Sequence, residues 1–186
     1  MEYQLIRSRR KTLAICVNVQ GEVIVRAPMR MSMAKIQAFL DEKEEWIHRT
    51  QEKQQKISAQ RKDIVLTADQ IRQVKQLVKE DLIQRCKTYE PLLGVKCNAL
   101  KVNSAKSHWG SCNSKGTINF TYRLWFAPES LRDYVVVHEL AHLIEMNHSE
   151  RFWKHVERVL PDYKQRRRQL KEFQGQVAII EGAEQK

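Results

Sequence analysis

The pattern of apolar and polar positions in the first 28 residues indicates β-strands. The segments YQLIRS, TLAICVNV and EVIVRAP either alternate or run apolar with β-branched side chains. Gln20 and Gly21 suit a turn between the second and third segments. The pattern therefore predicts a small β unit at the start of the chain.

Helical spacing replaces this pattern after Pro28. Ser32 can cap a helix whose apolar positions recur from Ile36 to Ile47. The polar stretch 51–62 fits either a solvated helix end or a linker, and we place the weakest domain joint there. A second helix is expected from about Thr67, its N-cap, to Glu90. Pro91 and Gly94 are expected to stop it.

Short strands and three further helices are expected in the rest of the chain. CNALKVNSAK and TINFTYRLWF resemble antiparallel strands around a turn at residues 113–116. The helices are one opened by Pro128, one capped by Ser149 that runs from Glu150 to about Leu160, and a basic one over residues 163–173 beyond Pro161. The last dozen residues look frayed.

These elements predict an α+β protein with three parts. Residues 1–62 form an N-terminal β unit and helix, residues 63–175 a catalytic metal-binding domain, and residues 176–186 a tail. The 186 residues suffice for one domain with a full core and a small appendage.

Composition favours a folded protein outside the membrane. The chain is 42% hydrophobic and 30% charged, and no apolar run approaches the roughly 20 residues that span a bilayer. The first residues lack the pattern of a secretory signal, so a cytoplasmic location is expected. The four cysteines form no C-x-x-C pair, so they are expected to be free thiols.

The formal charge of +11 comes from 33 basic and 22 acidic residues. Such a balance attracts phosphate, nucleic acid or acidic substrates. The alternative is a basic surface without a particular partner, because most basic residues alternate with acidic ones and only residues 166–168 form a tight run.

The stretch HELAH carries the strongest chemical signal. His138 and His142 are four residues apart on a predicted helix, so they differ by about 40° in direction and about 6 Å along the axis. Two imidazoles at this spacing can hold one cation. Glu139 is turned about 100° from His138 and can reach a water on the metal. This is the arrangement of H-E-x-x-H zinc hydrolases, with Glu139 as general base.

A catalytic zinc site needs a third protein ligand and one open position. His148 is the candidate, but a continuous helix would turn it about 240° away from His142. The helix must therefore end before His148. Asn147 is expected to supply the left-handed stop, and Ser149 the cap of the next helix.

Other residues are weaker candidates for the same site. Phe152 and Trp153 are expected to pack against it, and Gly110 to allow a close backbone approach. Glu145 and Asp133 are possible partners of the ligand histidines. Five side chains could approach the metal as anion-stabilising or substrate-contacting groups, although packing is the simpler role for Tyr134 and exposure for His108: His108, Tyr122, Arg123, Tyr134 and Arg151.

The residues HELAHLIEMNHSERFW, preceded by SHWGSCNSKGTINFTYRLWFAPESLRDYVVV, resemble the YgjP-like family of zinc metallohydrolases, relatives of the SprT-like and WLM proteases. The N-terminal SRRKTLAICVNVQGEVIVRAP and EEWIHR also fit, so the resemblance spans about residues 1 to 170. It implies a small N-terminal β unit and a minimal zincin-like domain. His138, His142 and His148 match the family's metal ligands, and Glu139 its catalytic glutamate.

Three functions follow as hypotheses. The first is a zinc-dependent peptidase whose strands before the metal helix offer an edge to an extended peptide. The second is a metal-dependent nucleoside triphosphate (UTP-type) pyrophosphatase, an activity also described for family members. The third is a nucleic-acid-binding module with a structural metal. Three imidazoles favour Zn²⁺, while manganese, nickel or cobalt can also bind such a site. The substrate, native metal and oligomeric state stay open.

Overall fold

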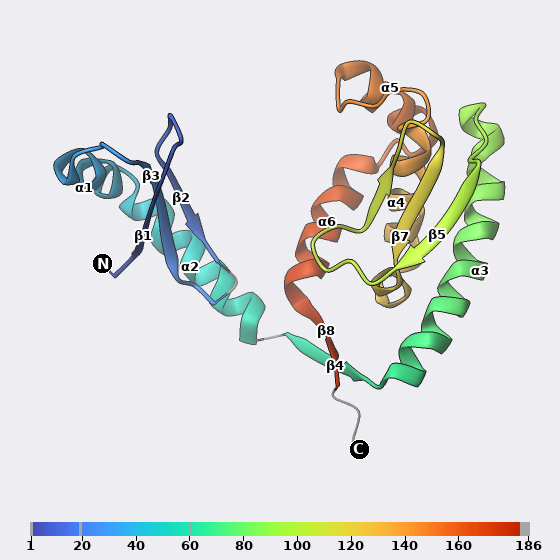
Figure 1. Ribbon diagram of the computed structural model, residues 1–186, viewed down its shortest axis with the longest axis horizontal. Helices are drawn as coiled ribbons and strands as arrows, with labels where there is room; N and C mark the ends of the chain where they lie inside the picture. The colour runs from blue at the N-terminus through green and yellow to red at the C-terminus, as the bar shows by residue number, and fades with distance from the viewer. Residues whose placement is uncertain (1, 19, 60, 183–186) are drawn as a thin grey trace. The chain divides into compact units, whose positions relative to one another are not determined.

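The computed structural model describes residues 2–18, 20–59 and 61–182. The chain divides into two compact units. Unit 1 is Met1–Lys62 with Gly175–Ala178, and unit 2 is Asp63–Gln174 with Ile179–Lys186. Both contain helices and strands, so the expected α+β class is confirmed (Figure 1).

Unit 1 packs two helices against a three-stranded sheet. Its elements are β1 (Gln4–Ser8), β2 (Ala14–Val17), β3 (Val23–Pro28), α1 (Met33–Glu42) and α2 (Glu44–Ala59). β3 is central, parallel to β1 and antiparallel to β2. Its alternate residues Val23, Val25 and Ala27 are buried in a core that includes Ile36 and Leu40 of α1.

Caps define the helices of unit 1. The Ser32 hydroxyl accepts from the Lys35 amide, as its N-cap role predicts. The apolar pattern from Ile36 to Ile47 belongs to two helices, since the first ends at Lys43. Of the two options for residues 51–62, the solvated helix end is right as far as Ala59.

Unit 2 is built around the helix that carries HELAH. Apart from the end residues Lys62 and Gly175–Ala178, which belong to unit 1, its elements are β4 (Lys62–Leu66), α3 (Ala68–Leu93), β5 (Ala99–Asn103), β6 (Gly110–Cys112), β7 (Thr117–Thr121), the 3₁₀ helix η1 (Tyr122–Phe126), α4 (Glu129–Ala141), α5 (Glu150–Val159), α6 (Tyr163–Gln176) and β8 (Val177–Glu181). In Figure 1, α4 lies behind β5 and β7, between α3 and α6. Most of α4 is buried, including Val135, Val136 and Val137.

The predicted hairpin is only partly right. β6 and β7 are antiparallel around the Asn113–Gly116 turn, but β5 runs parallel to β7. The strand order is β5-β7-β6, so β6 has one open edge. The end of TINFTYRLWF is not a strand, because Thr121 caps η1 by accepting from the Arg123 amide.

Two further expectations about chain breaks are wrong. Pro91 does not stop α3, which continues to Leu93 and ends at Gly94 with φ 72°. A proline near a helix end forfeits only one backbone hydrogen bond, and the left-handed glycine is the stronger stop. The frayed tail is also wrong for Val177–Glu181, which forms β8 beside β4. Residues 183–186 lie outside the described residues.

Ion pairs fix the first half of α4 to its neighbours. Arg85 of α3 bonds Asp81, with Nε 2.8 Å from Oδ2, and also Asp133 of α4. Arg166 of α6 donates from Nη1 to the Ser130 oxygen at 2.9 Å. The Arg85 and Asp133 side chains are 14% and 19% exposed, so solvent screens this pair less than a surface pair. Asp133 is thereby committed to structure and is not a partner of the histidines.

Arg123 holds β8 against unit 2 through two hydrogen bonds, and its substitution tests this arrangement. Its Nη1 donates to the Ile179 oxygen at 2.6 Å, and its Nη2 donates to Glu181 Oε1 at 2.9 Å. Arg123→Met should lower the free energy of unfolding by about 1–3 kcal/mol, because two part-buried hydrogen bonds to β8 are lost. Chemical denaturation measures this change. Arg72→Met, which removes an exposed ion pair with Asp69, should change it by less than about 0.5 kcal/mol. Equal effects of the two substitutions would contradict the role of Arg123.

Candidate metal centre

His138, His142 and His148 lie together, and we call them the histidine cluster. Each offers one ring nitrogen within 4.8 Å of the other two, and no other group of three candidate metal ligands occurs among the described residues. Nε2 of His138 lies 3.0 Å from Nε2 of His148. Two of the residues come from α4 and its C-cap, and the third from the turn that follows.

The path of the chain after α4 brings the third histidine back. α4 ends at Ala141, with His142 as its C-cap, so the helix stops earlier than the sequence analysis expected. Asn147 is not left-handed, since no described residue other than glycine has a positive φ. Instead its Oδ1 accepts from the Ser149 amide at 2.9 Å. Ser149 then caps α5, as predicted.

Main-chain and aromatic contacts orient the rings. His142 Nδ1 lies 3.1 Å from the Glu145 main-chain oxygen, which leaves its Nε2 for a ligand. The suggested Glu145 partner is therefore right, but through the backbone. The Phe152 ring centroid is 4.9, 4.5 and 4.8 Å from those of the three histidines, and Trp153 stacks on His148 at 5.7 Å.

Burial keeps two of the imidazoles neutral. It lowers the pKa of His138 to about 3, with further lowering from the charges of His142, His148 and Arg167. It also lowers the pKa of His142, against the raising effect of the bond to Glu145. A neutral imidazole is the form that binds a metal. The donor set of three imidazoles, one of them on the exposed His148, fits a zinc-type site with an open position.

Glu139 lies beside the cluster and against the sheet. It is 5% exposed, and burial raises the pKa of its carboxyl group to about 8. A Cβ placed on Gly110 of β6 would come within 2.6 Å of Glu139 Cγ and 2.7 Å of Oε1. The expected close backbone approach at Gly110 is confirmed. The side chain that fills the space beside this glycine belongs to Glu139, the candidate general base.

A pocket of about 240 Å³ opens beside this carboxyl group. We call it the Glu139 pocket; its lining residues are His108, Trp109, Gly110, Tyr134, Val135, His138, Glu139 and Leu170. Tyr134 is both packed and in the pocket, with its ring centroid 5.9 Å from that of His138. Burial raises the pKa of its phenol to about 12, so Tyr134 lines the pocket as an uncharged side chain. Leu170 was missed by sequence reasoning, since its pattern on α6 is that of any core residue.

The other candidates point elsewhere. Tyr122 is fully buried, and its hydroxyl lies 3.4 Å from Glu181 Oε1. Arg123 binds β8, as described above. Arg151 makes an exposed ion pair with Glu145, with N and O 3.8 Å apart. The structure therefore places only His108 and Tyr134 of the five in the Glu139 pocket.

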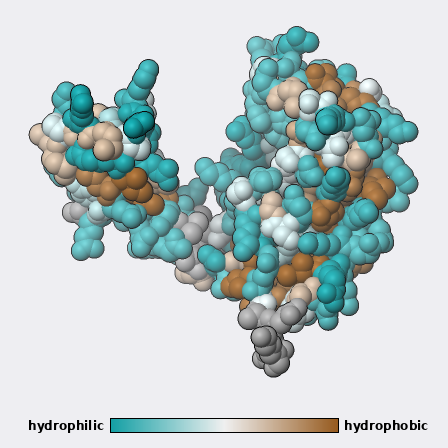
Figure 2. Space-filling model, in the orientation of Figure 1, coloured by the Kyte–Doolittle hydropathy of each residue, from teal (hydrophilic) through white to brown (hydrophobic). Residues whose placement is uncertain are grey.

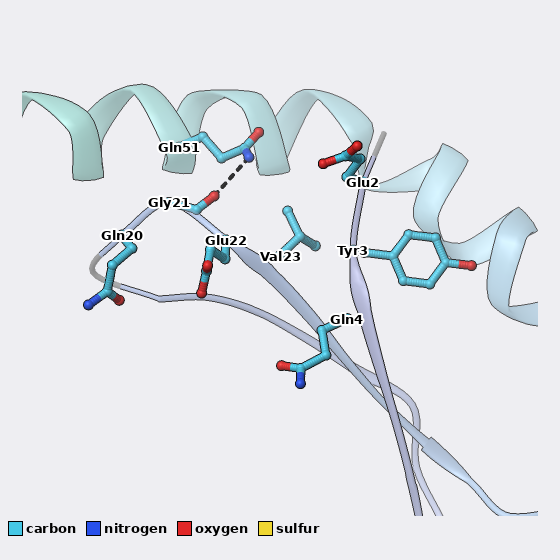
Figure 3. A pocket seen from close by; sticks show the side chains of 8 residues that line it. All are labelled: Glu2, Tyr3, Gln4, Gln20, Gly21, Glu22, Val23 and Gln51. Atoms are coloured by element: carbon cyan, nitrogen blue, oxygen red, sulfur yellow. Dashed lines mark hydrogen bonds between the residues drawn. The ribbon is translucent and has the colours of Figure 1, made fainter.

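Unit 1 has a separate hollow of about 1000 Å³ (Figure 3). Its lining side chains are mostly polar, and Gln51 crosses part of it to donate to the Gly21 oxygen at 2.9 Å. Among the described residues it contains no cluster of metal ligands. The histidine cluster is therefore the site with the clearer chemistry.

Similarity to a known family agrees with this chemistry. A family model described as YgjP-like, metallopeptidase domain, matches residues 11–72 and 66–173. The solved metallopeptidase zymogen abylysin of Pyrococcus abyssi is 25% identical, covering 52% of this chain and 99% of its own, with a TM-score of 0.46. The zymogen jannalysin of Methanocaldococcus jannaschii is 17% identical, covering 50% and 94%, with a TM-score of 0.43. No curated protein matches the chain.

Removing one ring of the cluster should abolish tight metal binding. His142→Ala should weaken Zn²⁺ affinity by about 100-fold or more, because one of three donors and its fixed orientation are lost. Competition with a chromophoric chelator gives the affinity, and elemental analysis the stoichiometry. His155→Ala on α5, which lies outside the cluster, is the matched control and should bind as the wild type does. Unchanged affinity in His142→Ala would show that the metal lies elsewhere.

The contact between β6 and α4 predicts that Gly110 cannot be replaced by a larger residue without loss of stability. Gly110→Ala should lower the free energy of unfolding by about 1–3 kcal/mol, because the new methyl group overlaps the buried Glu139 side chain. Thermal and urea denaturation measure this loss. Ser111→Ala, at the next position of β6, should be nearly neutral. Wild-type stability of Gly110→Ala would mean that β6 does not approach Glu139 this closely.

Proposed function

Because the chain belongs to the YgjP-like metallopeptidase family, we propose that it hydrolyses peptide bonds at the histidine cluster, with zinc as the metal and Glu139 as the general base. The observation that carries this proposal is the position of Glu139. Glu139 follows His138 on α4, packs against Gly110 of β6, and lines the Glu139 pocket together with His138.

The three imidazoles would hold a divalent metal, which would supply Lewis acidity toward a peptide carbonyl and would lower the pKa of water. Glu139 then has two tasks. Its carboxylate takes the proton of the attacking water, and its carboxyl group delivers that proton to the leaving amine. The packing of Phe152 on all three rings, and of Gly110 on Glu139, holds these groups without help from a substrate.

The open edge of β6 can hold an extended peptide. In the hairpin, Asn113 N donates to the Thr117 oxygen and Thr121 N to the Trp109 oxygen. Antiparallel pairing alternates, so the N–H and C=O groups of Gly110 and Cys112 point away from β7. These groups can bond a substrate strand alongside Glu139, which is recognition by strand addition.

The Glu139 pocket favours a peptide over a nucleotide. Its walls include Trp109, Val135 and Leu170, which suit a large apolar side chain. None of its lining residues is lysine or arginine, the side chains that hold phosphates. The lining of the Glu139 pocket therefore supports the peptidase hypothesis more than the nucleotide hypothesis.

None of the described helices is both long and apolar enough to cross a membrane. The face drawn in Figure 2 is largely hydrophilic, with separate apolar patches.

Replacing the general base should separate chemistry from metal binding. Glu139→Gln should lower kcat on an unfolded protein substrate by about 10²- to 10⁴-fold, because the amide cannot take a proton, while zinc stays bound. Mass spectrometry reads the products, and elemental analysis the metal. Glu157→Gln, an exposed glutamate on α5, is the matched control and should keep full activity.

Nucleoside triphosphates belong in the same assay. Release of pyrophosphate by the wild type but not by Glu139→Gln, with no peptide product, would overturn the peptidase proposal. Equal peptide products from wild type and Glu139→Gln would show that Glu139 is not the base.

A further inference from the structure

A second pocket, which shares no lining residue with the Glu139 pocket, adjoins the histidine cluster at His142. Its volume is about 530 Å³, within the range of pockets that bind ligands. Three segments form it: residues 95–98 after α3, the Asn113–Gly116 turn, and residues 142–146 after α4. His142 is among its lining residues, so any group bound there lies next to the metal site. We call it the lysine pocket, after Lys96 and Lys115.

The charge of this pocket is positive. Lys96 and Lys115 line it, and no carboxylate does. Within the described part of the chain, neither lysine has an ion-pair partner. The nearby Glu90 accepts from the Cys97 amide at 3.0 Å, and Glu145 pairs with Arg151. The two lysines are therefore available to a ligand, and no carboxylate among the lining residues competes for them.

The backbone that presents Lys115 is fixed before any ligand binds. Asn113 Oδ1 accepts from the amides of Lys115 and Thr117, both at 3.0 Å. Asn98 Nδ2 donates to the Lys115 oxygen at 2.7 Å, and Asn98 N to the Gly116 oxygen at 2.9 Å. A fixed backbone at this wall reduces the entropy lost on binding.

The two pockets can be assigned to the two sides of the cleaved bond. Glu139 hands its proton to the leaving amine, and Glu139 lines only the Glu139 pocket. The amine side of the substrate therefore runs toward that pocket. The acyl side runs along β6 past Cys112 toward Asn113, which lines the lysine pocket.

We infer that the lysine pocket binds an acidic side chain of the substrate on the acyl side of the scissile bond. Asp or Glu there meets two lysine ammonium groups, whereas Lys or Arg is repelled by them. This inference rests on the proposed peptidase function and specifies its substrates: acidic before the cleaved bond and apolar after it.

The test is a library of synthetic peptides that differ only at the acyl-side positions, with Glu, Gln or Lys, digested by the zinc-loaded full chain. Wild type should cleave the Glu peptides about fivefold to tenfold faster, in kcat/KM, than the Lys peptides. Lys96→Glu and Lys115→Glu should each reduce or reverse this ratio. The matched control Lys79→Glu, an exposed lysine of α3, should keep it. Higher ionic strength should narrow the wild-type ratio, because salt screens the lysines.

The outcomes separate this inference from the proposal beneath it. Cleavage of the Glu, Gln and Lys peptides at equal rates would overturn the inference that the lysine pocket binds an acidic side chain. It would leave the peptidase proposal standing. A ratio that responds to Lys79→Glu as much as to Lys96→Glu shows only a general charge effect and also overturns it. Cleavage of no peptide by the wild type overturns the peptidase proposal itself.

Discussion

The approach of β6 to α4 at Gly110 is the constraint on which the site depends. Only a residue without a side chain lets the strand lie this close to Glu139. The contact helps to bury the carboxyl group, and burial raises its pKa. Because Glu139 and His138 share α4, this contact sets how close the strand lies to the candidate base, and a shift of β6 would move the strand away from both residues.

Local chemistry made much of this structure predictable. Ser32, Thr67 and Ser149 cap the helices that they were expected to cap, and the spacing of His138 and His142 required a shared helix face. Pairings between distant segments were not predictable: β5 is parallel to β7, and β8 pairs with β4 more than 100 residues earlier. The periodicity of one strand says nothing about its neighbour. The turn to His148 was expected, but its geometry depends on an Asn147 side-chain bond rather than a left-handed backbone.

The two halves of α4 are held by different forces. Its first half carries Asp133, which forms ion pairs with Arg85 of α3 and Arg166 of α6. Its second half carries His138, Glu139 and His142, which have no ion pair among the described residues and are surrounded by apolar and aromatic groups. A buried carboxyl group without a charge partner destabilises the fold. The absence of such partners leaves the imidazoles and Glu139 free to interact with a metal and a substrate.

This division bears on how metal binding relates to folding. In small zinc domains the metal supplies the folding free energy, because the ligands have no other contacts. Here Phe152 and Trp153 pack on the histidine rings, and the core of unit 2 extends well beyond the site. The ring positions are therefore supported by apolar packing. A metal bound to the cluster adds stability by mass action, as RT ln(1 + [M]/Kd). A preorganised cluster also explains how His148 can be exposed and still be held near its partners, since the Trp153 ring covers one of its faces.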